Sequence, residues 1–138
     1  MSPAAKLLAA CVALFSAAPA FAASDLVGTW FGHGQRDDKN AMYIDRMFAD
    51  GRWRGEYRTC VKGKALDQVQ TGHWSFQGDI LSLRVDTVNE VLWSHTDGYK
   101  MLAHSDKAQK YISLDWNFPF TPKRVADDFQ MPSCDLVS

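Results

Sequence analysis

The sequence predicts an all-β protein, a single up-and-down antiparallel β-barrel of about eight short strands. Apolar and polar residues alternate through most of the chain, and glycine and aspartate interrupt this alternation at short intervals. No long stretch repeats apolar residues at helical spacing. The 138 residues fit one domain, and an aromatic content of 12% argues against a disordered chain.

Residues 1–22 are expected to be a secretory signal peptide. Lys6 precedes an apolar run at 7–18, and Ala20-Phe21-Ala22 has the small-x-small form of a cleavage site. The run is shorter than the roughly 20 residues that span a bilayer, so we expect no integral membrane span. The alternative is a lipobox ending at Cys11, but the apolar run continues beyond that cysteine. We therefore expect a periplasmic or secreted domain at residues 23–138.

The first strand is expected at residues 26–34, with Trp30 on its inner face. The first hairpin follows around Asp50-Gly51, a dipeptide typical of two-residue type I′ turns. A symmetric turn at this dipeptide pairs Phe48 with Trp53 and Arg46 with Gly55. The inner face of this hairpin would then be apolar except for Arg46.

A second hairpin is expected to turn at Gly78-Asp79. It pairs Phe76 with Leu81, Trp74 with Leu83 and Gly72 with Val85, while the other face is polar. The remaining elements are expected to be a polar loop at 61–68, strands at 97–103 and 109–116, a turn at 105–107, a short edge strand at 120–125 interrupted by Pro122, and a tail of one short turn and coil at 126–138.

Two cysteines, Cys60 and Cys134, remain after removal of the signal peptide. In an oxidising compartment such a pair favours a disulfide, and a free thiol or a metal ligand is the alternative. Closing this long loop would contribute about 4 kcal/mol in the chain-entropy model. Cys60 shares its strand parity with Arg58 and Glu56, so it should face outward. The bond would then hold the tail against the outside of the sheet.

Four motifs appear in the order found in a known family. They are Gly28-Thr29-Trp30, the 48–53 hairpin, Gly72-His73-Trp74 followed by Gly78-Asp79-x-Leu81-x-Leu83, and Tyr99-x-Met101. Together they make residues 25–125 resemble the small bacterial lipocalin-like (calycin) barrels. The resemblance implies a barrel that Trp30 plugs at one end and that binds a small, mainly apolar or amphipathic ligand. The chain is shorter than true lipocalins and lacks a clear C-terminal helix.

A fainter resemblance is to the avidins, which share the Gly-x-Trp opening and an early Gly-x-Tyr, here Gly55-Glu56-Tyr57. Gly32 stands where that family has its biotin-binding asparagine, so we do not expect biotin binding.

The expected ligand site combines inward aromatic rings with one charge. Its residues are Arg46, Trp53, Tyr57, Trp74, Tyr99 and Trp116. The guanidinium of Arg46 could bind a carboxylate or phosphate of the ligand. Alternatively, Arg46 pairs with Asp115 or extends past the rim of the barrel. So many large rings also fit a filled core, in which case the protein would be a non-enzymatic module that binds another envelope protein.

Other functional classes find little support. The four histidines, His33, His73, His95 and His104, lack the spacing of common metal sites. Arg52, Arg54 and Arg58 share one strand face, but the neighbouring rings point to the other face and the net charge is −1, so no nucleic-acid binding is expected. No catalytic motif is present, so we expect neither an enzyme nor a cofactor, and an enzyme is kept as the weaker alternative.

Overall fold

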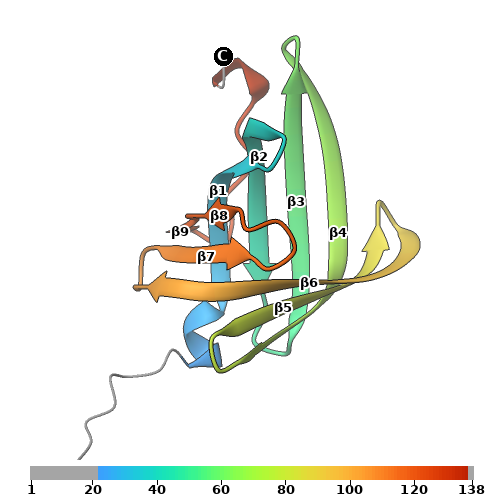
Figure 1. Ribbon diagram of the computed structural model, residues 1–138. Helices are drawn as coiled ribbons and strands as arrows, with labels where there is room; N and C mark the ends of the chain where they lie inside the picture. Colours follow the sequence, from blue (N-terminus) through green and yellow to red (C-terminus); the bar gives the residue numbers. More distant parts are fainter. Residues whose placement is uncertain (1–21, 137–138) are drawn as a thin grey trace, which may run out of the picture.

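Nine antiparallel strands form one sheet in the computed structural model, which describes residues 22–136 (Figure 1). The expected signal peptide, including Cys11, lies outside the described residues except for Ala22. The strands are β1 (Gly28–Gln35), β2 (Asp38–Met47), β3 (Arg52–Val61), β4 (Lys64–Gln77), β5 (Ile80–Val88), β6 (Val91–His104), β7 (Gln109–Ser113), β8 (Pro119–Phe120) and β9 (Lys123–Val125), with two short 3-10 helices, η1 (Ala23–Leu26) and η2 (Cys134–Leu136). Within residues 22–136, no helix is long and apolar enough to cross a membrane.

The sheet runs up and down from β1 to β8, each strand beside the next, and curls strongly into a half-barrel (Figure 1). Residues 119–125 connect its two edges, because β8 pairs with β7 while β9 pairs with β1. The all-β antiparallel prediction is therefore confirmed. The single strand expected at 120–125 is instead two strands with different partners, and Pro122, which has no N–H to donate, lies between them.

The two hairpins predicted in detail have different outcomes. In the β4–β5 hairpin, Phe76 pairs with Leu81 and Trp74 with Leu83, as expected. In the β2–β3 hairpin, Met47 rather than Phe48 lies opposite Trp53, and Asp45 rather than Arg46 lies opposite Gly55. The register there is one residue off the prediction, which turns every side chain of β2 to the opposite face of the sheet.

The turn between β2 and β3 explains this shift. It is closed by a hydrogen bond from the Phe48 N–H to the Arg52 carbonyl, and the Gly51 N–H donates back to the Phe48 carbonyl. Gly51 has φ +89°, which favours glycine, and Asp50 accepts hydrogen bonds from the backbone and side chain of Arg52. Residues 49–51 therefore lie between the closing residues Phe48 and Arg52, one more than the two central residues of a type I′ turn.

The polar loop expected at 61–68 is wrong. β3 and β4 pair without interruption up to Val61 and Lys64, and the chain reverses at Lys62 and Gly63, both with positive φ. These two strands form the long hairpin that rises above the rest of the sheet (Figure 1). Residues 64–68 are exposed, so this part of β4 lacks the apolar alternation that marks a strand in sequence.

The core is packed at the end of the sheet where β1 begins. Trp30 is fully buried there, and its indole Nε1 donates to the Leu26 carbonyl over 3.0 Å. The other buried apolar residues of this cluster are Leu26, Met47, Trp53, Leu81, Leu83, Val85, Met101 and Tyr111. Gly72 belongs to the same region, since a side chain there would overlap the backbone of Arg84 across the β4–β5 pair.

The C-terminal segment lies against the outer face of the sheet. Cys60 and Cys134 form a disulfide with their Cα atoms 5.5 Å apart, as the sequence predicts. Arg58 donates to the Pro132 carbonyl, and the Phe129 ring packs on Phe31 with centroids 5.0 Å apart. The outward orientation of Cys60 and its attachment to the tail are thus confirmed.

Candidate functional site

A cavity of about 350 Å³ opens at the end of the curled sheet that the core cluster leaves unfilled. Side chains from all strands from β1 to β8 line it, and the tyrosines come from β2, β3, β6 and β7. The tyrosines and carboxylates of this lining are Tyr43 and Asp45 of β2, Tyr57 of β3, Asp97 and Tyr99 of β6, and Tyr111 of β7. Each of these strands thus contributes a tyrosine, and two of them add a carboxylate.

The interior of the sheet is therefore divided into a filled and an open part. Between Trp30, Met47 and Leu81 the remaining space is only about 10 Å³, too little for any organic ligand. The filled core expected from the number of rings is correct for this end alone. At the other end the tyrosine rings stand around the cavity, with the centroids of Tyr99 and Tyr111 5.2 Å apart.

Asp45 is the buried charged group of this cavity. The residue is 8% exposed, and the Trp53 Nε1 donates to its Oδ1 over 3.0 Å. Burial raises the pKa of the Asp45 carboxyl to about 6, while hydrogen bonds from Trp53 and Tyr111 act in the opposite direction. No arginine, lysine or histidine of residues 22–136 forms an ion pair with Asp45.

Two glycines leave room for the rings around Asp45. Gly55 lies directly opposite Asp45, and a Cβ there would press on the rings of Trp53 and Tyr57. A Cβ at Gly32 would overlap the ring of Tyr43. The space that these positions give up is thus taken by aromatic side chains that point inward.

The tyrosines of the cavity remain neutral over the ordinary pH range. Burial is the largest influence in each case, and it raises the pKa values of Tyr43, Tyr57, Tyr99 and Tyr111 well above the usual value for a phenol. The negative charge of Asp45 acts in the same direction on all four. The tyrosines therefore offer neutral hydroxyls and ring faces to a ligand.

Polar side chains line the cavity beside the tyrosines. Gln35, Gln68 and Gln70 line it, and the Arg36 guanidinium lies 4.0 Å from the centre of the Trp116 ring. Asp97 accepts a hydrogen bond from His95 Nε2 at 2.6 Å. A molecule in the cavity would thus meet polar groups as well as tyrosine rings.

The aromatic residues predicted for the ligand site are only partly brought together. Tyr57, Tyr99 and Trp116 line the cavity. Trp53 lies behind Asp45 and acts as its hydrogen-bond donor. Trp74 is separate from the cavity, and its Nε1 donates to the Phe48 carbonyl at the β2–β3 turn.

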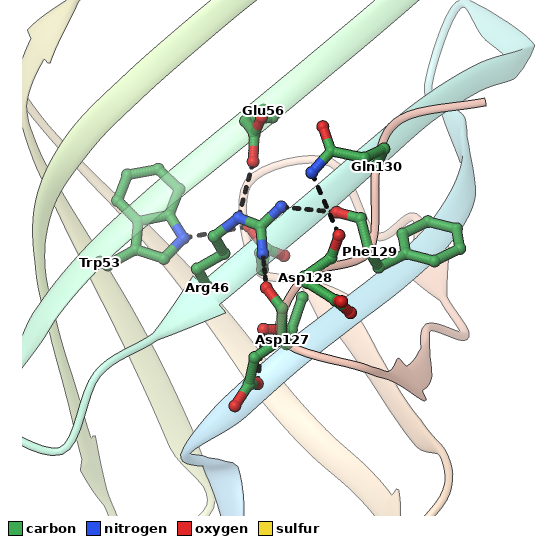
Figure 2. A network of polar contacts seen from close by, with 9 residues as sticks. Arg46, Trp53, Glu56, Asp127, Asp128, Phe129 and Gln130 are labelled. Atoms are coloured by element: carbon green, nitrogen blue, oxygen red, sulfur yellow. Dashed lines mark hydrogen bonds and ion pairs between the residues drawn. The ribbon is translucent and has the colours of Figure 1, made fainter. Parts of the chain in front are cut away.

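The inward position expected for Arg46 is wrong. The one-residue register shift places Arg46 on the outer face, where Nε pairs with Glu56 at 2.8 Å (Figure 2). Its Nη1 and Nη2 donate to the carbonyls of Asp127 and Phe129 at 2.6 and 2.8 Å. Arg46 therefore neither pairs with Asp115 nor faces a ligand in the cavity. It binds the C-terminal segment instead.

Asp45 is the residue that the sequence reasoning missed. The pairing expected from sequence puts its neighbour Arg46 on the inner face, and Asp45 therefore on the outer face. A turn with three central residues, 49–51, places Tyr43 and Asp45 on the same face as Trp53 and Tyr57. The signal was therefore present in the alternation of β2, but only the correct turn length reveals it.

Within residues 22–136, no cluster of three or more histidine, cysteine or acidic side chains could hold a metal ion. Comparison with protein-family models and with curated proteins finds no match to this chain. The geometry and charge of the cavity are what indicate a function.

Proposed function

We propose that the protein is an exported, lipocalin-like binding protein that holds a small amphipathic molecule in the cavity around Tyr43, Tyr57 and Tyr99. The cavity itself carries this proposal. Its volume of about 350 Å³ lies within the range of roughly 300 to 1,000 Å³ of small-molecule sites. Both aromatic rings and polar groups line it, so a molecule with an apolar body and a polar end would fit it.

The order of the strands supports the lipocalin-like part of the proposal. Strands follow one another in the sheet, and the first begins with Gly28-Thr29-Trp30, whose indole is buried in the filled end. The disulfide between Cys60 and Cys134 is compatible with an oxidising compartment outside the cytoplasm, in keeping with a signal peptide at residues 1–22.

A co-purification experiment tests ligand binding. The full-length gene is expressed with export, and the purified protein is analysed by native mass spectrometry and by solvent extraction. Thr59 lines the cavity, so Thr59→Trp should fill it, whereas Lys110→Trp changes an exposed residue. We expect a bound molecule in the wild type and in Lys110→Trp, and none in Thr59→Trp. A molecule retained by all three proteins would contradict a site in the cavity.

A second candidate function, interaction with another protein, rests on the tip of the β5–β6 hairpin. Val91, Leu92 and Trp93 are all exposed there, with Leu92 85% exposed. This tip projects away from the rest of the sheet (Figure 1). Exposed apolar patches of this kind are typical of interaction sites. In-cell crosslinking through position 92, compared with crosslinking through Lys110, would test whether a specific partner binds the tip.

A further inference from the structure

The carboxylate of Asp45 is buried in the cavity and has no cationic partner among residues 22–136. An isolated buried charge is costly, and proteins ordinarily pair it with an opposite charge. Hydrogen bonds from Trp53 and Tyr111 stabilise the carboxylate only in part, and within the described chain no basic side chain forms an ion pair with it. The missing positive charge is therefore a property that a ligand could supply.

We infer that the cavity binds a small organic cation, an amine or a quaternary ammonium compound, with its charged end beside Asp45 and its apolar part among the tyrosines. This inference rests on the proposed ligand-binding function and names the chemical class of the ligand. A neutral ligand would leave the carboxylate unpaired, and an anionic ligand would have to bring a second negative charge next to it.

The four tyrosines around Asp45 favour the same ligand class. Aromatic faces attract ammonium groups through their ring quadrupoles, by about 0.5–1 kcal/mol at exposed sites and more where water is excluded. The rings come from β2, β3, β6 and β7, so they surround the carboxylate from several directions. All four stay neutral, as described above, and leave Asp45 as the charged group at the floor.

The other charged groups that face the cavity are few. Asp97 lines it and is bonded to His95, and its negative charge also favours a cation. Arg36 is the basic residue among those that line the cavity, and its guanidinium is stacked on Trp116 at the mouth. The lining therefore carries two carboxylates against one guanidinium, with the guanidinium at the entrance.

Affinity for a cation should depend on pH through Asp45. The pKa of about 6 leaves the carboxyl mostly ionised at pH 7 and protonated at pH 4. Because a cation prefers the ionised form, binding should weaken by about tenfold for each pH unit below 6. The tyrosines do not titrate in this range. Asp97, which is bonded to His95, is the other carboxylate of the lining, and its replacement separates the contribution of this pair to the pH dependence from that of Asp45.

Isothermal titration calorimetry with three probes of similar size tests the inference. The probes are benzyltrimethylammonium, benzyl alcohol and benzoate, and the proteins are the wild type, Asp45→Asn and Asp97→Asn. We expect the wild type to bind the cation at least tenfold more tightly than the other two probes. Asp45→Asn should lose this preference and its pH dependence, while Asp97→Asn should keep both. Circular dichroism confirms that each variant is folded.

Each contrary result has a defined meaning. Equal binding of the cation and the alcohol, tighter binding of benzoate, or a cation preference that survives in Asp45→Asn would overturn the inference and leave the proposed function standing. The inference also fails if millimolar benzyltrimethylammonium does not bind the wild type. In that case a molecule that co-purifies with the wild type and not with Thr59→Trp would still support the proposed function.

Discussion

The indole of Trp53 donates its N–H to the carboxylate of Asp45 across 3.0 Å, inside the sheet and between residues of neighbouring strands. Trp53 is only 2% exposed and belongs to the packed core, so it holds one carboxylate oxygen in a fixed orientation. The rigid core thus presents a charged group to the open cavity. Because burial disfavours the ionised form of Asp45, this charged group lowers the stability of the folded protein while it serves the site.

Replacement of Asp45 by asparagine should stabilise the unliganded protein at neutral pH. The pKa of Asp45 is about 6 in the folded protein and 3.8 as an ordinary value, so between these pH values the folded state binds more protons. The free energy of unfolding of the wild type therefore falls as pH rises from about 4 to 6, by about 3 kcal/mol from this group. Urea denaturation at pH 4 and pH 7 measures the effect.

The comparison of the two proteins isolates Asp45 from other carboxyls. Asp50, Asp67 and Asp86 have lowered pKa values through hydrogen bonds and nearby charges, so their contribution to stability grows as pH rises. These groups are the same in both proteins and cancel in the difference. A stability difference between wild type and Asp45→Asn that stays constant from pH 4 to pH 7 would show that Asp45 titrates normally.

Trp53→Phe should raise the pKa of Asp45 above 6. The substitution keeps a ring in the core but removes the N–H that favours the ionised carboxylate. Hydrogen bonds to charged groups contribute about 1.5–3 kcal/mol, so we expect a rise of about one pH unit or more. NMR titration of the carboxyl carbon of Asp45 measures it. Trp74→Phe is the matched control, because its indole bonds to the Phe48 carbonyl instead; an equal rise in both variants would contradict the assigned role.

The sequence predicts some strand pairs correctly and others not, for reasons that lie in the turns. At Gly78-Asp79 a two-residue turn connects β4 and β5, so symmetric pairing places Trp74 opposite Leu83 as observed. At Asp50-Gly51 the same reasoning fails because the turn recruits Phe48 and Arg52 through backbone hydrogen bonds. Turn length is decided by such local bonds, which the dipeptide alone does not reveal.

The consequences of this error were confined to one strand. The parity of β3 was assigned correctly, so Tyr57 is found inside and Cys60 outside, bonded to Cys134. The parity of β2 was inverted, which exchanged the positions of Arg46 and Asp45 and changed the charge expected in the cavity from positive to negative. A single residue of register thus decides which charge the sequence predicts inside the sheet.

Arg46→Met should loosen the C-terminal segment. The methionine keeps an apolar stem but removes three hydrogen bonds, to Glu56 and to the carbonyls of Asp127 and Phe129. We expect a loss of about 1–3 kcal/mol in unfolding free energy and faster hydrogen exchange in residues 126–134. Arg54→Met, an exposed neighbour opposite Arg46 on β3, should change stability by less than about 0.5 kcal/mol. Weakened ligand binding with an unchanged tail would contradict the outward position of Arg46.

Loss of the disulfide should destabilise the protein without removing the cavity. Cys60 and Cys134 are 74 residues apart in sequence, and in the chain-entropy model closing such a loop contributes about 4 kcal/mol. The double variant Cys60→Ser/Cys134→Ser should therefore unfold at lower urea concentration, and the wild type should show no free thiol among these two cysteines before reduction. Neither cysteine lines the cavity, so a bound ligand should still raise the melting temperature of the double variant.

The C-terminal segment is held by Arg58 and Arg46 as well as by the disulfide. Limited proteolysis should therefore cleave this segment faster in the double cysteine variant combined with Arg46→Met than in the double cysteine variant or in Arg46→Met alone. Cleavage at the same rate in all three proteins would show that the disulfide and the arginine do not act on the same segment.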